Sequence, residues 1–184
     1  MNYKNYITVR DAAWQILIDS KTHSPPVKVV QICKNMGIQV KLYESPELDD
    51  GYCKMYPNEP FIFVNARCSR ERQRFTIAHE LGHIVLGHVG KFPLINREPS
   101  PNDNQVETEA NTFAFRLLAP ACVFHELGIN NAYDIARICG ISLQSARFRY
   151  ERLKLLRGRN RFYTSDLEWQ VYMQFKDWVD ANKL

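Results

Sequence analysis

The chain has 184 residues, of which 45% are hydrophobic and 24% are charged, and its formal net charge at pH 7 is +4. This length suits one well-buried domain with a small appendage, and the composition excludes global disorder. The mild positive charge permits an acidic or nucleic-acid partner but does not require one.

The cysteines and the apolar runs limit where such a chain can work. No C-x-x-C pair occurs, which argues against a thiolate zinc site and a disulfide framework and fits a reducing cytosol. The first residues lack the basic and apolar regions of a signal peptide, and no apolar run approaches membrane-spanning length. We therefore expect a cytoplasmic protein without a membrane segment. The cysteines are Cys33, Cys53, Cys68, Cys122 and Cys139.

The N-terminal third predicts two helices followed by a small sheet. Apolar residues recur with helical spacing over residues 6–19, and a proline-started helix is expected over about 27–36. A strand over 38–43 comes next. A hairpin follows, and its second strand, Phe61 to Asn65, is apolar and rich in residues that favour strands.

The middle of the chain predicts two long helices separated by a loop. The first helix covers about residues 70–88, and the second covers about 105–118 and ends before Pro120. The intervening segment, 91–104, contains three prolines and several polar residues. It is therefore expected to form a loop over or beside the first of these helices.

The last third is predicted to be helical. Residues 130–157 indicate two short helices joined at the sequence CGIS, and a final amphipathic helix begins at the capping-box pair Ser165 and Glu168. We therefore predict an α+β fold. A first domain over 1–125 would contain a small antiparallel sheet packed on helices, and a C-terminal helical segment over 126–184 would pack on it.

Residues 75–88, FTIAHELGHIVLGH, contain the group that points to chemistry. His79 and His83 are four residues apart and so lie on one face of a helix, where two imidazoles suit a zinc ion. Glu80 would act as the general base on a water at that ion. The alternative is a pair of hydrogen-bonded core histidines with no ligand.

The second long helix offers two candidates for a third protein ligand. Glu109 falls on a polar stripe with Gln105, Thr112 and Arg116, which we expect to face solvent. Glu107 lies on the apolar side, where a carboxylate is costly unless a cation compensates it. We therefore predict that Glu107 is the ligand and that Glu109 is a surface charge.

Three further predictions concern the surroundings of the metal. Asn111 could accept the free ring N–H of a liganding histidine and so fix its tautomer, although a packing role is the alternative. His88 has the wrong spacing for the third histidine of H-E-x-x-H-x-x-G-x-x-H and is expected to be a helix-end residue. The apolar strand either belongs to the core or offers a sheet edge that holds a peptide substrate across the metal. Its residues are Phe61, Ile62, Phe63, Val64 and Asn65.

Two histidines and one glutamate leave a fourth position for water, which is typical of a catalytic rather than a structural zinc ion. A general base beside such a water suits hydrolysis of a peptide bond, because the same carboxyl group can later protonate the leaving amine.

The stretches RFTIAHELGHIVLGH and VETEANTFAFRLLAP together resemble the ImmA/IrrE family of metallopeptidases, which are gluzincin-like. The resemblance extends over about residues 27–120, and it implies that the predicted first domain, 1–125, is a zincin-like metallopeptidase domain. It implies Zn²⁺ held by His79, His83 and Glu107, with Glu80 as general base, in a cytoplasmic bacterial or prophage protein. It also implies a partner repressor of the Cro/cI helix-turn-helix type, whose cleavage relieves repression of a mobile element or of stress genes.

The segment 131–157 resembles a helix-turn-helix and is basic, with Arg147, Arg149, Arg152, Lys154 and Arg157 on its second helix. Two interpretations stay open: a DNA-reading helix, or a docked helical pair with a solvated basic face.

We therefore expect a zinc-dependent endopeptidase that acts on a helix-turn-helix repressor. The alternatives are a zinc-containing regulatory or toxin-like binding module that pairs with such a repressor without proteolysis, and a DNA-binding regulator that uses residues 131–161.

Overall fold

The structure is a computed structural model that describes residues 3–46, 50–57, 59–89 and 103–183. The predicted loop over 91–104 lies almost wholly outside these residues. The described chain forms an α+β fold, as the sequence predicts. Its elements are α1 (Tyr3–Asp19), α2 (Val29–Asn35), β1 (Gln39–Tyr43), β2 (Gly51–Tyr56), β3 (Glu59–Asn65), α3 (Arg70–Val85), α4 (Asp103–Leu118), α5 (Ala121–Glu126), α6 (Ala132–Cys139), α7 (Leu143–Gly158) and α8 (Asp166–Asn182).

The sheet has three strands in the order β1-β3-β2, and it is mixed rather than antiparallel throughout. β2 pairs antiparallel with β3, as a hairpin must, but β1 pairs parallel with β3. The prediction of an antiparallel sheet is therefore wrong for one of the two strand pairs. The reason is that β3, the most apolar strand, takes the central position between β1 and β2, where both of its edges are covered.

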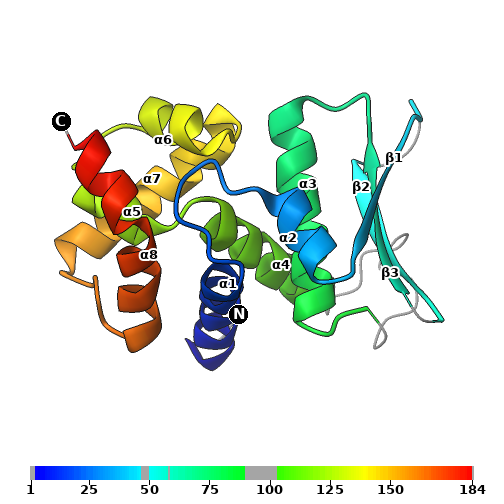
Figure 1. The fold of residues 1–184 in the computed structure, drawn as a ribbon, viewed down its shortest axis with the longest axis horizontal. Coiled ribbons are helices and arrows are strands. Elements are labelled where there is room, and N and C mark those ends of the chain that lie inside the picture. Colours follow the sequence, from blue (N-terminus) through cyan, green and yellow to red (C-terminus); the bar gives the residue numbers. More distant parts are fainter. Residues whose placement is uncertain (1–2, 47–49, 58, 90–102, 184) are drawn as a thin grey trace.

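The elements are arranged along the molecule in a way that puts α3 and α4 at its centre (Figure 1). The sheet lies at one end against α3, and α5 to α8 gather at the other end, with α1 and α4 between them. α3 and α4 approach closely at Gly82, where an added Cβ would lie 3.1 Å from the Phe113 ring and 3.3 Å from the Ala110 backbone. This close approach brings the two predicted ligand-bearing helices together.

The hydrophobic core extends through both predicted parts of the chain. One buried cluster contains Ile62 and Leu81 from the sheet side, Phe113 from α4, and Leu153 and Phe175 from the C-terminal helices. The C-terminal helices therefore share a core with the rest. The boundary at residue 125 stays a prediction.

The predicted start of the last helix has the expected hydrogen bonds. The Ser165 hydroxyl accepts a hydrogen bond from the backbone N–H of Glu168, and the Glu168 carboxylate accepts one from the backbone N–H of Thr164. The first bond satisfies an N–H group that a helix end leaves without an intrahelical partner, and the second holds the residue before the N-cap rather than Ser165 itself.

The five cysteines form no disulfide bonds. Within the described helices, none combines the length and the apolar character that a bilayer crossing requires.

Candidate metal centre

The helix that carries the H-E-x-x-H sequence begins and ends at residues that fix its position. At its start, the Ser69 hydroxyl accepts a hydrogen bond from the backbone N–H of Arg72. At its end, Gly87 adopts the left-handed conformation with φ of 69°, which glycine tolerates without strain. The chain then turns back, and the backbone N–H of His88 donates to the carbonyl of His83 over 2.9 Å. This turn places the His88 ring beside the His83 ring.

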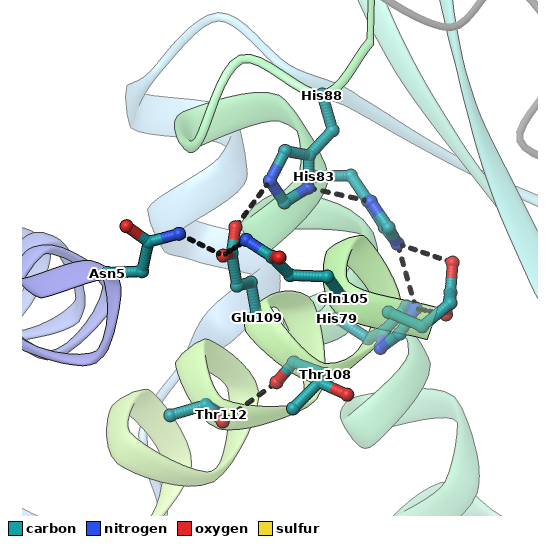
Figure 2. A network of polar contacts seen from close by, with 9 residues as sticks. Asn5, His79, His83, His88, Gln105, Thr108, Glu109 and Thr112 are labelled. Carbon is teal, nitrogen blue, oxygen red and sulfur yellow. Dashed lines mark hydrogen bonds and ion pairs between the residues drawn. The ribbon is translucent and has the colours of Figure 1, made fainter. Parts of the chain in front are cut away.

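Three side-chain donors from α3 and α4 converge on one point (Figure 2). His79 Nε2 lies 3.0 Å from His83 Nε2 and 3.1 Å from Glu107 Oε2, and His83 Nε2 lies 3.3 Å from Glu107 Oε1. Ligands about 2.0–2.1 Å from a tetrahedral zinc ion lie roughly 3.3 Å from one another. The separations therefore fit a single ion held by these three residues.

The other ring nitrogen of His79 has a partner that sets its tautomer. His79 Nδ1 lies 3.1 Å from Asn111 Oδ1, and because an amide oxygen only accepts, Nδ1 carries the proton. In the neutral ring the lone pair is therefore on Nε2, which is the nitrogen that lies next to His83 and Glu107. Asn111 lies at the position predicted for it, and its function at a metal stays a prediction.

The other ring nitrogen of His83 begins a chain of hydrogen bonds that sequence reasoning missed. His83 Nδ1 lies 3.1 Å from His88 Nδ1, and His88 Nε2 lies 3.3 Å from Glu109 Oε2 (Figure 2). The Glu109 carboxylate can only accept, so His88 Nε2 carries the proton and donates to it. The neutral His88 ring then has its lone pair on Nδ1, which accepts a hydrogen bond from His83 Nδ1. Burial, followed by the charge of His83, lowers the pKa of His88, which favours the neutral ring that this chain needs. His88 is therefore more than a helix-end residue.

The predicted exposures of the two α4 glutamates are wrong. The Glu109 side chain is 13% exposed, whereas that of Glu107 is 40% exposed. The stripe that we expected to face solvent packs against α1 instead, and Glu109 accepts hydrogen bonds from Asn5 and Gln105 as well as from His88. Contact with both histidines, rather than burial, is what supports Glu107 as the third ligand.

The charges of the group suit a cation. Burial opposes ionisation of Glu107, but hydrogen bonds to His79 and His83 hold the pKa of Glu107 far below its usual value. Burial also lowers the pKa of His79, yet the hydrogen bond to Glu107 and the charges of Glu80 and Glu107 raise it overall. The Glu107 carboxylate is therefore ionised and available as a ligand.

Glu80 is buried beside the donor group, with 8% of its surface exposed. The Cys53 thiol of β2 hydrogen-bonds to Glu80, and burial, followed by the Glu80 charge, raises the pKa of this thiol. The thiol is therefore a neutral donor to the carboxylate. Sequence alone gave no sign of this contact, which depends on the placement of β2 against α3.

The predicted substrate strand is not a sheet edge. β3 pairs with β1 over residues 61–65 on one side and with β2 over residues 59–64 on the other. Its backbone therefore has no free edge for a peptide, and the substrate-edge interpretation of Phe61, Ile62, Phe63, Val64 and Asn65 is wrong. The free edges of the described sheet belong to β1 and β2.

The basic residues of the helix-turn-helix-like segment do not form one solvated face. α6 and α7 are joined through Gly140, which has φ of 59°. Arg149 Nε donates to the Ala119 carbonyl, and Arg157 donates to the carbonyls of Ile129 and Phe124. These internal contacts leave fewer arginines for DNA than the sequence indicates.

The fold and the convergent His-His-Glu group, with a buried glutamate beside it, define a metallopeptidase-like domain. A model of the peptidase M78 family, described as the IrrE N-terminal-like domain, matches residues 33–151, which is more than half of the chain. The chain belongs to this ImmA/IrrE family.

Three known proteins show the extent of the similarity. "Uncharacterized immunity region protein 2" of Bacillus phage phi105 is 25% identical over 81% of this chain and 95% of its own length. The radiation response metalloprotease IrrE of Deinococcus radiodurans is 34% identical over 39% of this chain, but the match covers only 23% of that protein. A Mycobacterium tuberculosis transcriptional regulator has a similar fold, with a TM-score of 0.58 at 18% identity, over 77% of this chain and 55% of that one.

Proposed function

We propose that this protein is a zinc-dependent endopeptidase that cleaves a helix-turn-helix repressor. The observation that carries the proposal is the convergence of His79, His83 and Glu107 with the buried carboxylate of Glu80 beside them. A purely structural zinc site would have four protein ligands and no need of an adjacent general base. A metalloprotease among the relatives supports the activity.

The residues of the site have distinct tasks in this proposal. The zinc ion, when bound by His79, His83 and Glu107, would polarise the scissile carbonyl and acidify a water. Glu80 takes a proton from the attacking water and passes it to the leaving amine, so that it ends each cycle ionised. Asn111 and His88 hold the two imidazoles in the tautomer that presents Nε2 to the ion.

β2 is the better candidate for a substrate-binding strand. It lies at one edge of the described sheet, and Cys53 in its middle contacts Glu80. An extended peptide that adds to an open strand edge is held by backbone hydrogen bonds with little dependence on sequence. A peptide on the free edge of β2 would therefore lie next to the general base.

The relative that matches almost over its whole length bears the name of a phage immunity region protein. This name supports a phage or other mobile element as the setting, and it is consistent with the repressor partner that the family resemblance implies. The same similarity would also suit a regulatory module that binds the repressor without cutting it.

The deciding experiment combines the zinc-loaded protein with purified helix-turn-helix repressors of the Cro/cI type and follows cleavage by gel and mass spectrometry. Wild type is expected to cut at one or a few positions, and Glu80→Gln is expected to keep its zinc but lose cleavage by roughly a thousandfold or more. Glu71→Gln is the matched control, because Glu71 is exposed in the first turn of the same helix. A stable complex without cleavage in the zinc-loaded wild type would instead establish the binding module.

A further inference from the structure

A cavity of about 200 Å³ lies between α1, α4 and α7, and its residues play no part in the proposed peptidase reaction. α4 contributes to both places, but Arg116 lies half a helical turn around the axis from Glu107, since nine residues at 3.6 per turn make two and a half turns. The cavity is therefore on the other side of α4 from the metal group. Its lining residues are Tyr6, Thr112, Phe115, Arg116, Phe148, Arg149 and Arg152.

Three arginines gather at this cavity with little negative charge to balance them. Arg116 and Arg149 are each only 4% exposed. Among the described residues, none of the three forms an ion pair with a carboxylate within 4 Å. Glu168 is buried and acts on Arg116 and Arg149 only through its charge. This one carboxylate therefore acts on two of the three guanidinium groups.

The hydrogen-bond partners that these guanidinium groups do have are neutral. Arg116 and Arg152 both donate to the Tyr6 hydroxyl and both lie over its ring, at 4.8 and 5.2 Å from the ring centre. Arg149 donates to the Ala119 carbonyl. Burial, followed by the charges of Arg149 and Arg152, lowers the pKa of Arg116 well below its usual value. The cluster is thus a concentration of positive charge that a neutral phenol and a carbonyl do not offset.

Each of the three guanidinium groups also keeps a buried nitrogen with no hydrogen-bond acceptor in the described structure. These atoms are Arg116 Nε, Arg149 Nη2 and Arg152 Nε. Buried polar groups in folded proteins are nearly always paired, so three unpaired donors in one cluster indicate an absent acceptor. A small anion with several oxygen atoms would both balance the charge and accept hydrogen bonds from these nitrogens.

We propose that this cavity, which we call the arginine pocket, binds a small molecule whose oxyanion, a phosphate or a carboxylate, is attached to a flat apolar group. Guanidinium forks pair with such oxyanions through two parallel hydrogen bonds. The volume is below the range of about 300–1,000 Å³ typical of drug-sized ligands, so the ligand is small or only partly enclosed.

The apolar group of the ligand is assigned from the rim of the arginine pocket. Phe148 is 63% exposed, and its ring lies 6.4 Å from that of Phe115. A large exposed aromatic side chain beside a cluster of cations offers a stacking surface next to an anion site. A nucleoside monophosphate has both parts, and inorganic phosphate has only the first.

Calorimetric titration of the full chain with inorganic phosphate and with adenosine monophosphate tests the proposal. Both are expected to bind, and the nucleotide more tightly. Arg152→Gln, at a half-buried position, is expected to weaken both by roughly ten- to a hundredfold, the effect of losing a charge-assisted hydrogen bond. Phe148→Ala is expected to weaken only the nucleotide. Arg147→Gln removes the same charge from an exposed position of the same helix and is expected to change neither.

Several outcomes would overturn the proposal. The proposal is wrong if neither inorganic phosphate nor adenosine monophosphate binds. It is also wrong if binding is unchanged in Arg152→Gln, because the anion would then lie elsewhere, for example at the metal group. Binding of duplex DNA in preference to both probes would replace the small molecule by nucleic acid. Circular dichroism shows whether Arg152→Gln is folded. If it is not, a nucleotide affinity unchanged in Phe148→Ala would contradict the assigned pocket.

Discussion

Replacement of His88 by phenylalanine tests whether the hydrogen-bond chain behind His83 supports metal binding. The substitution keeps a ring of similar size at the buried position but removes the acceptor of the His83 Nδ1 proton. The His83 side chain is only 1% exposed, so water cannot replace that acceptor. A buried donor left without a partner costs about 1–3 kcal/mol, which corresponds to zinc binding weaker by roughly ten- to a hundredfold.

The matched comparison is Asn111→Ala, which removes the corresponding acceptor from His79. The His79 side chain is 15% exposed, so water can reach the freed N–H. A water-mediated bond recovers most of the energy of the direct one, and the expected loss of zinc affinity is therefore about threefold to tenfold. The structure thus predicts a larger effect for the substitution behind His83, which is the more deeply buried of the two histidines.

Competition with a chromophoric chelator measures zinc affinity, and circular dichroism of the metal-free variants shows whether they are folded. Glu109→Gln should add little to His88→Phe, because the two residues act through one chain and their effects are not additive. An affinity that is unchanged in His88→Phe, or lowered less than in Asn111→Ala, would refute the inference that His88 orients His83.

Three further predictions concern ligand choice, helix packing and pH. Zinc content by mass spectrometry should fall well below one ion per chain in Glu107→Gln and stay near one in Glu109→Gln. The reverse result would make Glu109 the third ligand in place of Glu107. Gly82→Ala should lower the unfolding free energy in urea by about 1–3 kcal/mol, because its Cβ would press on Phe113, whereas a gain would show that the helices move apart freely. Burial lowers the pKa of His125, so the unfolded chain takes up that proton first and stability falls as pH drops through about 6.5. Between pH 7 and pH 5, His125→Phe should lose less unfolding free energy than the wild type in urea titrations. An equal loss in both proteins would contradict the prediction.

The sequence predicted those parts of the site that depend on local geometry. The spacing of His79 and His83 requires only that residues 70–88 be helical, and α3 is a helix over both positions. The hairpin of β2 and β3 was likewise predicted from one short stretch of sequence, and the two strands pair antiparallel. Such features need no knowledge of how distant segments pack.

The errors arose where distant segments decide the outcome. The periodicity of α4 shows which residues share a face, but not what covers that face. α1, about a hundred residues earlier, packs there and buries Glu109 and Arg116. In the same way, the apolar character of β3 fits an edge or a centre equally well until β1 is placed beside it.

His88 illustrates a third kind of error. Its spacing excludes it from the known three-histidine pattern. In the structure its ring contacts Nδ1 of His83 and the Glu109 carboxylate, and it is not one of the three residues whose donor atoms converge. The turn at Gly87 is what returns the ring to α3. A pattern that lists only metal ligands has no place for a residue that orients a ligand, so the sequence alone could not reveal this function.

Helix α1 connects the two charged regions of the molecule through adjacent residues. The Asn5 side chain donates to Glu109, which ends the series of hydrogen bonds that begins at His83. The Tyr6 hydroxyl accepts from Arg116 and Arg152 in the arginine pocket. α1 lies outside residues 33–151, the part that matches the family. The hydrogen bonds behind the metal group are therefore completed by a helix that the family domain does not include. Because one rigid helix carries both contacts, a shift of α1 that alters the arginine pocket also moves the partner of Glu109, without any change in the H-E-x-x-H residues.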